Sequence, residues 1–343
     1  MNWRGTSRSS LLVGGRLTSV IAVVVLGVNL IPDGRLQDTV RLAAVAEDSG
    51  YQRCRIYDEG LVTHDVHVVS AAVLLATKYL TVGPGITNPY TRHPAQTAAA
   101  LASLNELASG RVSAGFGAGG SLTLAPLAIE RRRPLLALEE LILACRMLWS
   151  GAPATIDGTT ITLREARLGV GPAHIPIWLA GRGPRVLALG GRAADGVMLD
   201  FLHHSAIEGA VETVRQAASE SHRTVELSYS TSVVMTEADL EAVRPHMTYR
   251  LVDSPDPVKE MIGFDPESES RIRNAMTEGL AVAARHVRDE WILPFVVHGA
   301  PAECAAQLRK LERKHGLDEF LLPVFDMDDP ADYIARVGDL FEG

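Results

Sequence analysis

Several features that mark common classes of enzyme are missing from this sequence. Its 343 residues hold three cysteines, Cys54, Cys145 and Cys304, and none has the spacing of a metal or redox site. No H-E-x-x-H, G-x-S-x-G or P-loop motif occurs, so we expect neither a metal site nor serine hydrolysis. Scattered cysteines are typical of a reducing compartment, and we expect a cytoplasmic protein.

Positive charge and aromatic residues are also scarce. The formal net charge is −8, which argues against a nucleic acid or an anionic membrane as partner. Aromatic residues make up 5% of the chain and apolar residues 47%. The chain can therefore bury a sizeable core, built mostly from alanine, valine and leucine.

No apolar run is long enough to cross a bilayer. Residues 1–19 carry Arg4, Arg8 and Arg16 without an acid, and an apolar run over 20–31 follows, as in a signal peptide. That run lacks an A-x-A cleavage site, and a buried first strand over 21–29 explains it better. We therefore expect residues 1–19 to form a disordered N-terminal arm and residues 20–343 to form a single domain.

Strand-like and helix-like segments alternate along most of the chain. The helix candidates cover 36–49, 66–78, 94–108, 126–150, 184–192, 205–220, 301–314 and 330–341. The strand candidates cover 21–29, 53–57, 80–87, 111–116, 175–180, 196–200, 224–235, 291–297 and 318–325. Eight strands in this alternation predict a (β/α)8 barrel, with 291–297 as the odd segment and a doubly wound sheet as the alternative. A hairpin near 154–163 and a helical segment near 237–290, with about three helices, are predicted as insertions.

Two glycine-rich strand ends could bind a ligand. Glycines in the segment 83–89, GPGITNP, are typical of a bulge or of a close approach of backbone to a flat ligand, although an ordinary barrel turn would also explain them. The turn 180–184, AGRGP, precedes a helix and could bind an anion, with Arg182 as an extra donor. A plain turn between strand and helix is the alternative there.

Polar residues follow several strands, where barrel enzymes carry their catalytic groups. Each taken alone is better explained as a solvated loop residue or a helix cap. The set comprises Asp58, Glu59, Arg92, His93, Asp200, His203 and His204.

Taken together, these segments resemble the bacterial luciferase-like superfamily. Within it they are most similar to the branch that uses the deazaflavin coenzyme F420, typified by 5,10-methylenetetrahydromethanopterin reductase. The resemblance covers nearly the whole chain after about residue 22. It is strongest over 58–68, 82–94, 104–120, 176–199 and 286–301.

The resemblance implies a coenzyme site at named residues. A non-prolyl cis peptide bond between Gly85 and Ile86 would support the middle ring of the deazaflavin. Thr87 and Asn88 would flank that ring, and Asp58 would meet its polar edge. The remaining positions would line the pocket or hold the phosphate: Gly117, Gly119, Ala180, Gly181, Arg182 and Gly183.

The resemblance also implies an oxidoreductase that takes a small-molecule substrate and forms a homodimer. Hydride would pass between C5 of F420 and the carbon of a C=N or C=C bond, or of an alcohol or carbonyl. Two positions depart from the family pattern, since Glu59 stands where a histidine is frequent and Gly120 where an acid is frequent. Glu59 or His93 is then the candidate proton donor. An FMN-dependent monooxygenase and a non-catalytic barrel are the alternatives.

Overall fold

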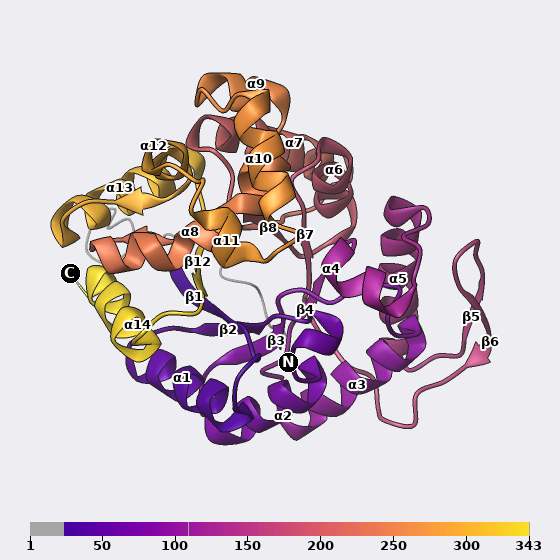
Figure 1. The fold of residues 1–343 in the computed structure, drawn as a ribbon. Coiled ribbons are helices and arrows are strands. Elements are labelled where there is room, and N and C mark those ends of the chain that lie inside the picture. Colours follow the sequence, from indigo (N-terminus) through magenta and orange to yellow (C-terminus); the bar gives the residue numbers. More distant parts are fainter. Residues whose placement is uncertain (1–23, 109, 343) are drawn as a thin grey trace, which may run out of the picture.

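The chain folds into a closed barrel of parallel strands surrounded by helices (Figure 1). The computed structural model describes residues 24–108 and 110–342. Eight strands follow the order β3-β2-β1-β12-β9-β8-β7-β4, and parallel bridges Val82–Val112 and Thr87–Phe116 join the two end strands. This closure confirms the (β/α)8 barrel and excludes the open sheet. The strands are β1 (Val25–Leu30), β2 (Arg53–Ile56), β3 (Thr81–Pro84), β4 (Ala114–Phe116), β7 (Ile177–Ala180), β8 (Gly196–Asp200), β9 (Glu226–Ser230) and β12 (Glu319–Val324).

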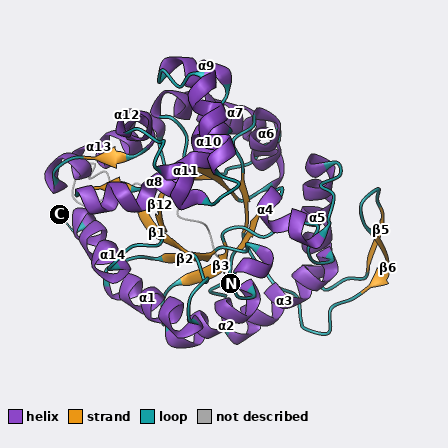
Figure 2. Cartoon of the chain, in the orientation of Figure 1, coloured by secondary structure: helices purple, strands orange, loops and turns teal. Residues whose placement is uncertain are grey.

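Eight main helices cover the outside of the barrel (Figure 2). Five of them, α3, α5, α6, α13 and α14, start with a proline at the first helical position, where the missing N–H costs nothing. The helices are α1 (Leu36–Asp48), α2 (Val66–Ala76), α3 (Pro94–Leu107), α5 (Pro134–Trp149), α6 (Pro184–Ala193), α7 (Ile207–Glu220), α13 (Pro301–His315) and α14 (Pro330–Gly338). No helix within the described residues is both long and apolar enough to cross a membrane.

The insertion after β9 forms a second cluster of helices with its own apolar core. Trp291 and Phe264 meet edge to face there at 5.0 Å, and the cluster continues onto Phe201 and Phe325 at the ends of β8 and β12. The described residues form five helices in this region, where about three were predicted, and α8 is the longest of the five. They are α8 (Glu237–Val252), α9 (Asp256–Met261), α10 (Pro266–Ala275), α11 (Leu280–Ala284) and α12 (Asp289–Ile292).

The prediction of a strand over 291–297 is wrong. These residues form the end of α12 and a 3-10 turn, and only β11 (Val297–His298) is extended. Burial of Trp291 and Ile292 in the core of the insertion outweighs their strand preference. The segment 224–235 is likewise divided, because β10 (Val233–Val234) leaves the barrel to pair with β11.

The predicted helix over 126–150 starts later than expected. Residues 128–133 are irregular, and α5 begins at Pro134, because a proline disfavours helical backbone in the residue before it. The short helix α4 (Ser121–Leu124) precedes this stretch. The hairpin is confirmed as β5 (Ala154–Asp157) and β6 (Thr162–Ala166). The predictions for residues 1–19, and for the first residues of strand 21–29, lie outside the described residues.

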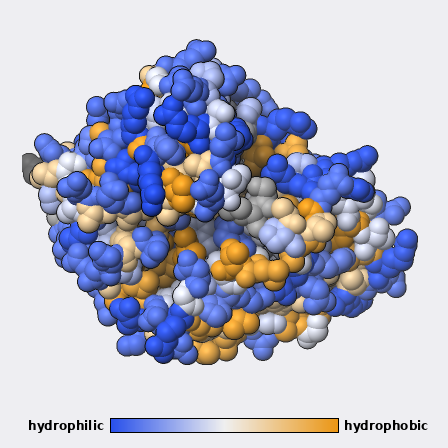
Figure 3. Space-filling model, in the orientation of Figure 1, coloured by the Kyte–Doolittle hydropathy of each residue, from blue (hydrophilic) through white to orange (hydrophobic). Residues whose placement is uncertain are grey.

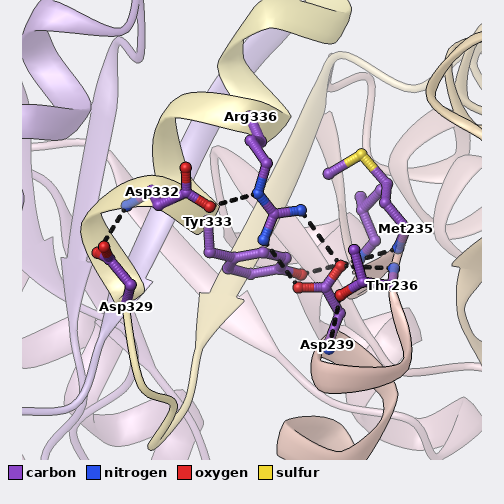
Figure 4. A network of polar contacts seen from close by, with 8 residues as sticks. Met235, Thr236, Asp239, Asp329, Asp332, Tyr333 and Arg336 are labelled. Atoms are coloured by element: carbon purple, nitrogen blue, oxygen red, sulfur yellow. Dashed lines mark hydrogen bonds and ion pairs between the residues drawn. The ribbon is translucent and has the colours of Figure 1, made fainter.

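A polar network fastens the start of α8 to α14 (Figure 4). Asp239 Oδ1 lies 2.9 Å from Arg336 Nη2, and its Oδ2 accepts hydrogen bonds from the backbone N–H groups of Met235 and Thr236 at 3.0 and 2.9 Å. Burial alone would raise the pKa of Asp239, but the Arg336 guanidinium and these N–H donors bring it below its ordinary value. The network therefore fixes where the helical insertion leaves the barrel.

Candidate active site

The backbone leaving β3 forms the centre of the site. Gly85 donates its N–H to Ile56 O at 2.7 Å, and Thr87 donates to Gly115 O at 2.9 Å, so the segment is bonded to both neighbouring strands. The peptide bond between Gly85 and Ile86 is cis, as the resemblance implied. Asn29 Nδ2, on β1, donates a hydrogen bond to Gly85 O at 2.8 Å and fixes the position of this carbonyl group.

Two glycines of this centre lie against neighbouring side chains. A Cβ added to Gly85 would lie 2.4 Å from the Cβ of Arg55, and one added to Gly117 would lie 2.4 Å from Cδ1 of Ile86. Both are closer than real side chains come, so each glycine allows a close approach between chain segments. Gly119 has a φ of +74°, and an added Cβ would meet Asn88 at 3.3 Å. The structure thus brings together the predicted residues Gly85, Ile86, Thr87, Asn88, Gly117 and Gly119.

A buried ion pair lies next to this centre. Arg55 is 1% exposed, donates to Glu319 Oε2 at 3.0 Å and lies over the ring of Trp178 at 4.4 Å. Ile86 packs against the cluster that contains Trp178. Sequence analysis did not identify Asn29 or Arg55, because both lie inside strands, where the alternation of side chains points only to burial.

Two carboxyl groups follow β2 and are each held by a threonine. Thr87 Oγ1 donates to Asp58 Oδ2 at 2.6 Å, which places Asp58 beside the β3 segment. Thr123 Oγ1 donates to Glu59 Oε2 at 2.8 Å. Burial raises the pKa of Glu59, and the nearby charges of Asp58 and Asp200 add to this rise.

His93 has a different environment from Glu59. It is exposed and caps the N-terminus of α3, where its Nδ1 accepts a hydrogen bond from the N–H of Ala95 at 3.2 Å. Its neighbour Arg92 pairs with Asp65, which caps α2. Nδ1 of His93 is thus engaged in helix capping, and Nε2 carries the proton of the neutral ring.

The turn after β7 borders a cavity of about 460 Å³. Gly183 caps α6, and Arg182 and Gly183 line the cavity together with His203, Asp253 and Ser254. Burial lowers the pKa of Arg182, and the charge of Arg250 lowers it further. A half-buried guanidinium beside a helix N-terminus fits an anion such as a phosphate, so Arg182 and Gly183 fit the role that the resemblance implied. Ala180 and Gly181 are not among the residues that line this cavity.

Helix α8 crosses the ends of two barrel strands and adds side chains that no sequence motif indicated. Arg250 pairs with Asp200 at the end of β8, with Nη2 and Oδ2 2.8 Å apart. His246 stacks on Phe325, which follows β12, with ring centroids 3.7 Å apart. Burial lowers the pKa of His246 to about 4, so this ring is neutral at neutral pH. The only signal in the sequence was the presence of a helical insertion.

The fold is that of a (β/α)8 barrel with its polar and glycine-rich segments gathered at the strand ends, where barrel enzymes carry their sites. The luciferase-like monooxygenase family matches this chain over residues 18–319, so the chain belongs to that family and is an oxidoreductase of it.

Several relatives of the chain are named reductases. A 5,10-methylenetetrahydromethanopterin reductase from Methanolobus tindarius is 29% identical over 293 residues, which cover 83% of this chain and 90% of the relative. The structure of the coenzyme F420-dependent tetrahydromethanopterin reductase from Methanopyrus kandleri matches with a TM-score of 0.84 at 25% identity, over 92% of this chain and 98% of that one. A monooxygenase from Streptomyces bottropensis matches with a TM-score of 0.69 at 21% identity, over 92% and 97%, and shares the fold.

Proposed function

We propose that this protein binds coenzyme F420 and transfers hydride between it and a carbon of a small organic substrate. The observation that carries the proposal is that a tightly packed glycine-lined segment, Gly85 to Asn88 with Gly117, and a cavity bordered by Arg182 follow neighbouring strands of the barrel, β3, β4 and β7. The first suits a flat ring and the second suits the phosphate of the same ligand. The named reductases among the relatives favour F420 over FMN.

The protein contributes binding and orientation, and the coenzyme, when bound, supplies hydride at C5. Gly85, Ile86, Thr87 and Asn88 would support the ring from one side, with Gly117 and Gly119 beside it. Asp58, fixed by Thr87, would meet the polar edge of the ring. Ala180, Gly181, Arg182 and Gly183 would hold the phosphate.

Glu59 supplies the proton in this proposal. Reduction of a C=N or C=C bond adds a hydride to one atom and a proton to its neighbour, and burial, which raises the pKa of Glu59, makes this carboxyl group a better holder of that proton than an exposed one. Glu59 is half-buried beside Asp58, whereas His93 is exposed and engaged as a helix cap. A carbonyl substrate would use the same proton, and an alcohol would return it to Glu59.

A fluorescence titration of the protein with F420 and with FMN tests the coenzyme. We expect quenching by F420, and Arg182→Gln should weaken F420 binding about tenfold, since it removes the charge beside the phosphate site. Arg185→Gln is the matched control, because Arg185 lies three residues further along the chain, exposed in the first turn of α6. Tight binding of FMN alone would favour the monooxygenase, and binding of neither would favour a non-catalytic barrel.

We also propose a homodimer that forms through α2 and the turn after it. Helix α2 contains no Asp, Glu, Lys or Arg, yet Leu75 is 71% and Val68 58% exposed, and Tyr79 just beyond is 79% exposed. Apolar residues gather along the lower edge of the molecule in Figure 3, where Figure 1 places α2 and α3. A helix that is apolar on every face needs a covering surface, and a second copy of the same face would provide it.

A further inference from the structure

The contact between Glu59 and Thr123 joins two loops that are far apart in the sequence. Glu59 follows β2, whereas Thr123 lies in α4, directly after the glycine-rich loop that leaves β4. The residues are 64 positions apart, and Thr123 is 3% exposed. A buried hydroxyl therefore reaches across the site to one oxygen of a carboxyl group.

The backbone keeps the two residues in place. Gly60 has a φ of +66°, and a Cβ added there would lie 3.2 Å from Cγ2 of Thr123 and 3.3 Å from its carbonyl oxygen. The turn that carries Glu59 thus packs directly against α4, and only glycine allows both the backbone conformation and the close approach. The hydrogen bond between Glu59 and Thr123 is built into this packing.

We propose that Thr123 is a positioning residue for Glu59. The Thr123 hydroxyl group decides which oxygen of the Glu59 carboxyl group carries the transferable proton, and how firmly that oxygen holds it. Thr123 donates to Oε2, which leaves Oε1 to carry the proton. The inference rests on the proposed function for the use of that proton. In reduction of a C=N bond, hydride goes to carbon, Glu59 gives its proton to nitrogen, and the resulting carboxylate regains a proton from water.

The groups around Glu59 have opposing effects on its pKa. Burial is the strongest influence and raises the pKa, and Asp58 and Asp200 raise it further. The hydrogen bond from Thr123 and the charge of Arg250 lower it. Groups that face Glu59 come from the ends of β2 and β8 and from α8: Tyr57, Asp58, Asp200, Tyr249 and Arg250. Thr123 is neutral and donates a hydrogen bond directly to the Glu59 carboxyl group, so this bond can be removed without altering any charge.

Carbon-13 NMR titration of the glutamate carboxyl groups in the ligand-free protein tests the proposal, with Glu59→Gln used to assign the Glu59 signal. Thr123→Val keeps the shape of the side chain but removes the donor. It should raise the pKa of Glu59 by about one pH unit, because the carboxylate loses a stabilising hydrogen bond. Thr123→Ser keeps the donor and should titrate as the unaltered protein does.

An unchanged Glu59 titration in Thr123→Val would overturn the proposal, as would an equal shift in Thr123→Ser. Thr123→Ala carries the same expectation as valine, should valine prevent folding. In F420-dependent turnover, the alkaline limit of activity should move upward with the pKa in Thr123→Val and stay in place in Thr123→Ser. If the protein binds no F420, the proposed function fails, while the NMR titration still decides the role of Thr123.

Discussion

At Gly85 and Gly117 the absence of a side chain lets a neighbouring residue approach the backbone closely. The two positions differ in the atom that approaches. Gly85 faces the Cβ of Arg55, an atom fixed to the backbone of β2. Gly117 faces Cδ1 of Ile86, the far end of a flexible side chain. A side chain at 85 would therefore force the strands apart, whereas one at 117 would only displace Ile86.

Gly117→Ala should consequently affect binding more than folding. The added methyl group displaces Ile86, and overpacking of this kind costs about 1–3 kcal/mol. If that cost falls on the coenzyme site, F420 affinity should drop about tenfold, which the fluorescence titration measures. Gly120→Ala is the control, because its Cβ would meet only Thr123 Oγ1, at 3.9 Å. Equal affinities for the two variants would show that the segment around Ile86 does not contact the coenzyme.

At the scale of elements, helix α8 covers the carboxyl ends of strands β8 and β12. Its first residues are fastened to α14 by Asp239 and Arg336, and its last turn reaches Asp200 through Arg250. The helix is thus held at both ends, and His246 lies between these two points on Phe325. The position of Arg250 and His246 over the site therefore depends on contacts that lie outside the site.

Asp239→Asn should loosen this attachment. Asp239 is 4% exposed, and the substitution removes its charge, so Arg336 keeps only the exposed Asp332 as a charged partner. We expect a cost of about 1–3 kcal/mol in the free energy of unfolding. Urea denaturation at neutral pH measures the loss, and Glu237→Gln, an exposed neighbour, should leave stability unchanged.

The effect of Asp239→Asn should also depend on pH. The folded-state pKa of Asp239 is lowered below the unfolded value of about 3.9, so its carboxylate stabilises the protein above that pH. This contribution is lost as the pH falls through the folded pKa. The difference between the unaltered protein and Asp239→Asn should therefore shrink below about pH 4, and a constant difference would contradict the assignment.

For the whole molecule, the apolar outer face of α2 predicts the state of assembly. Leu75→Glu would place a charge inside the proposed interface between two copies but in water on a single copy, so it should convert a dimer to a monomer without loss of the fold. Light scattering after size exclusion measures the mass. Leu143→Glu on α5 is the matched control, since Leu143 is 47% exposed and lies on a different helix. A dimeric Leu75→Glu protein would exclude this face.

The sequence by itself determined the barrel, its strand order along the chain and the glycine-rich segments of the site. These follow from local patterns: apolar spacing, prolines at helix starts and glycines at strand ends, each of which acts within a few residues. The resemblance added the cis bond at Gly85–Ile86, which is confirmed. The roles assigned to Glu59, His93 and the coenzyme-binding residues stay predictions.

Only the tertiary structure decided which distant residues meet. Thr123 reaches Glu59 across 64 positions, and Asn29 reaches Gly85 across 56. Arg250 joins Asp200 from an insertion without any motif, and residues 291–295 are helical because the core of that insertion buries Trp291. Such contacts depend on the packing of whole elements, and no local pattern in the chain encodes which side chains that packing brings together.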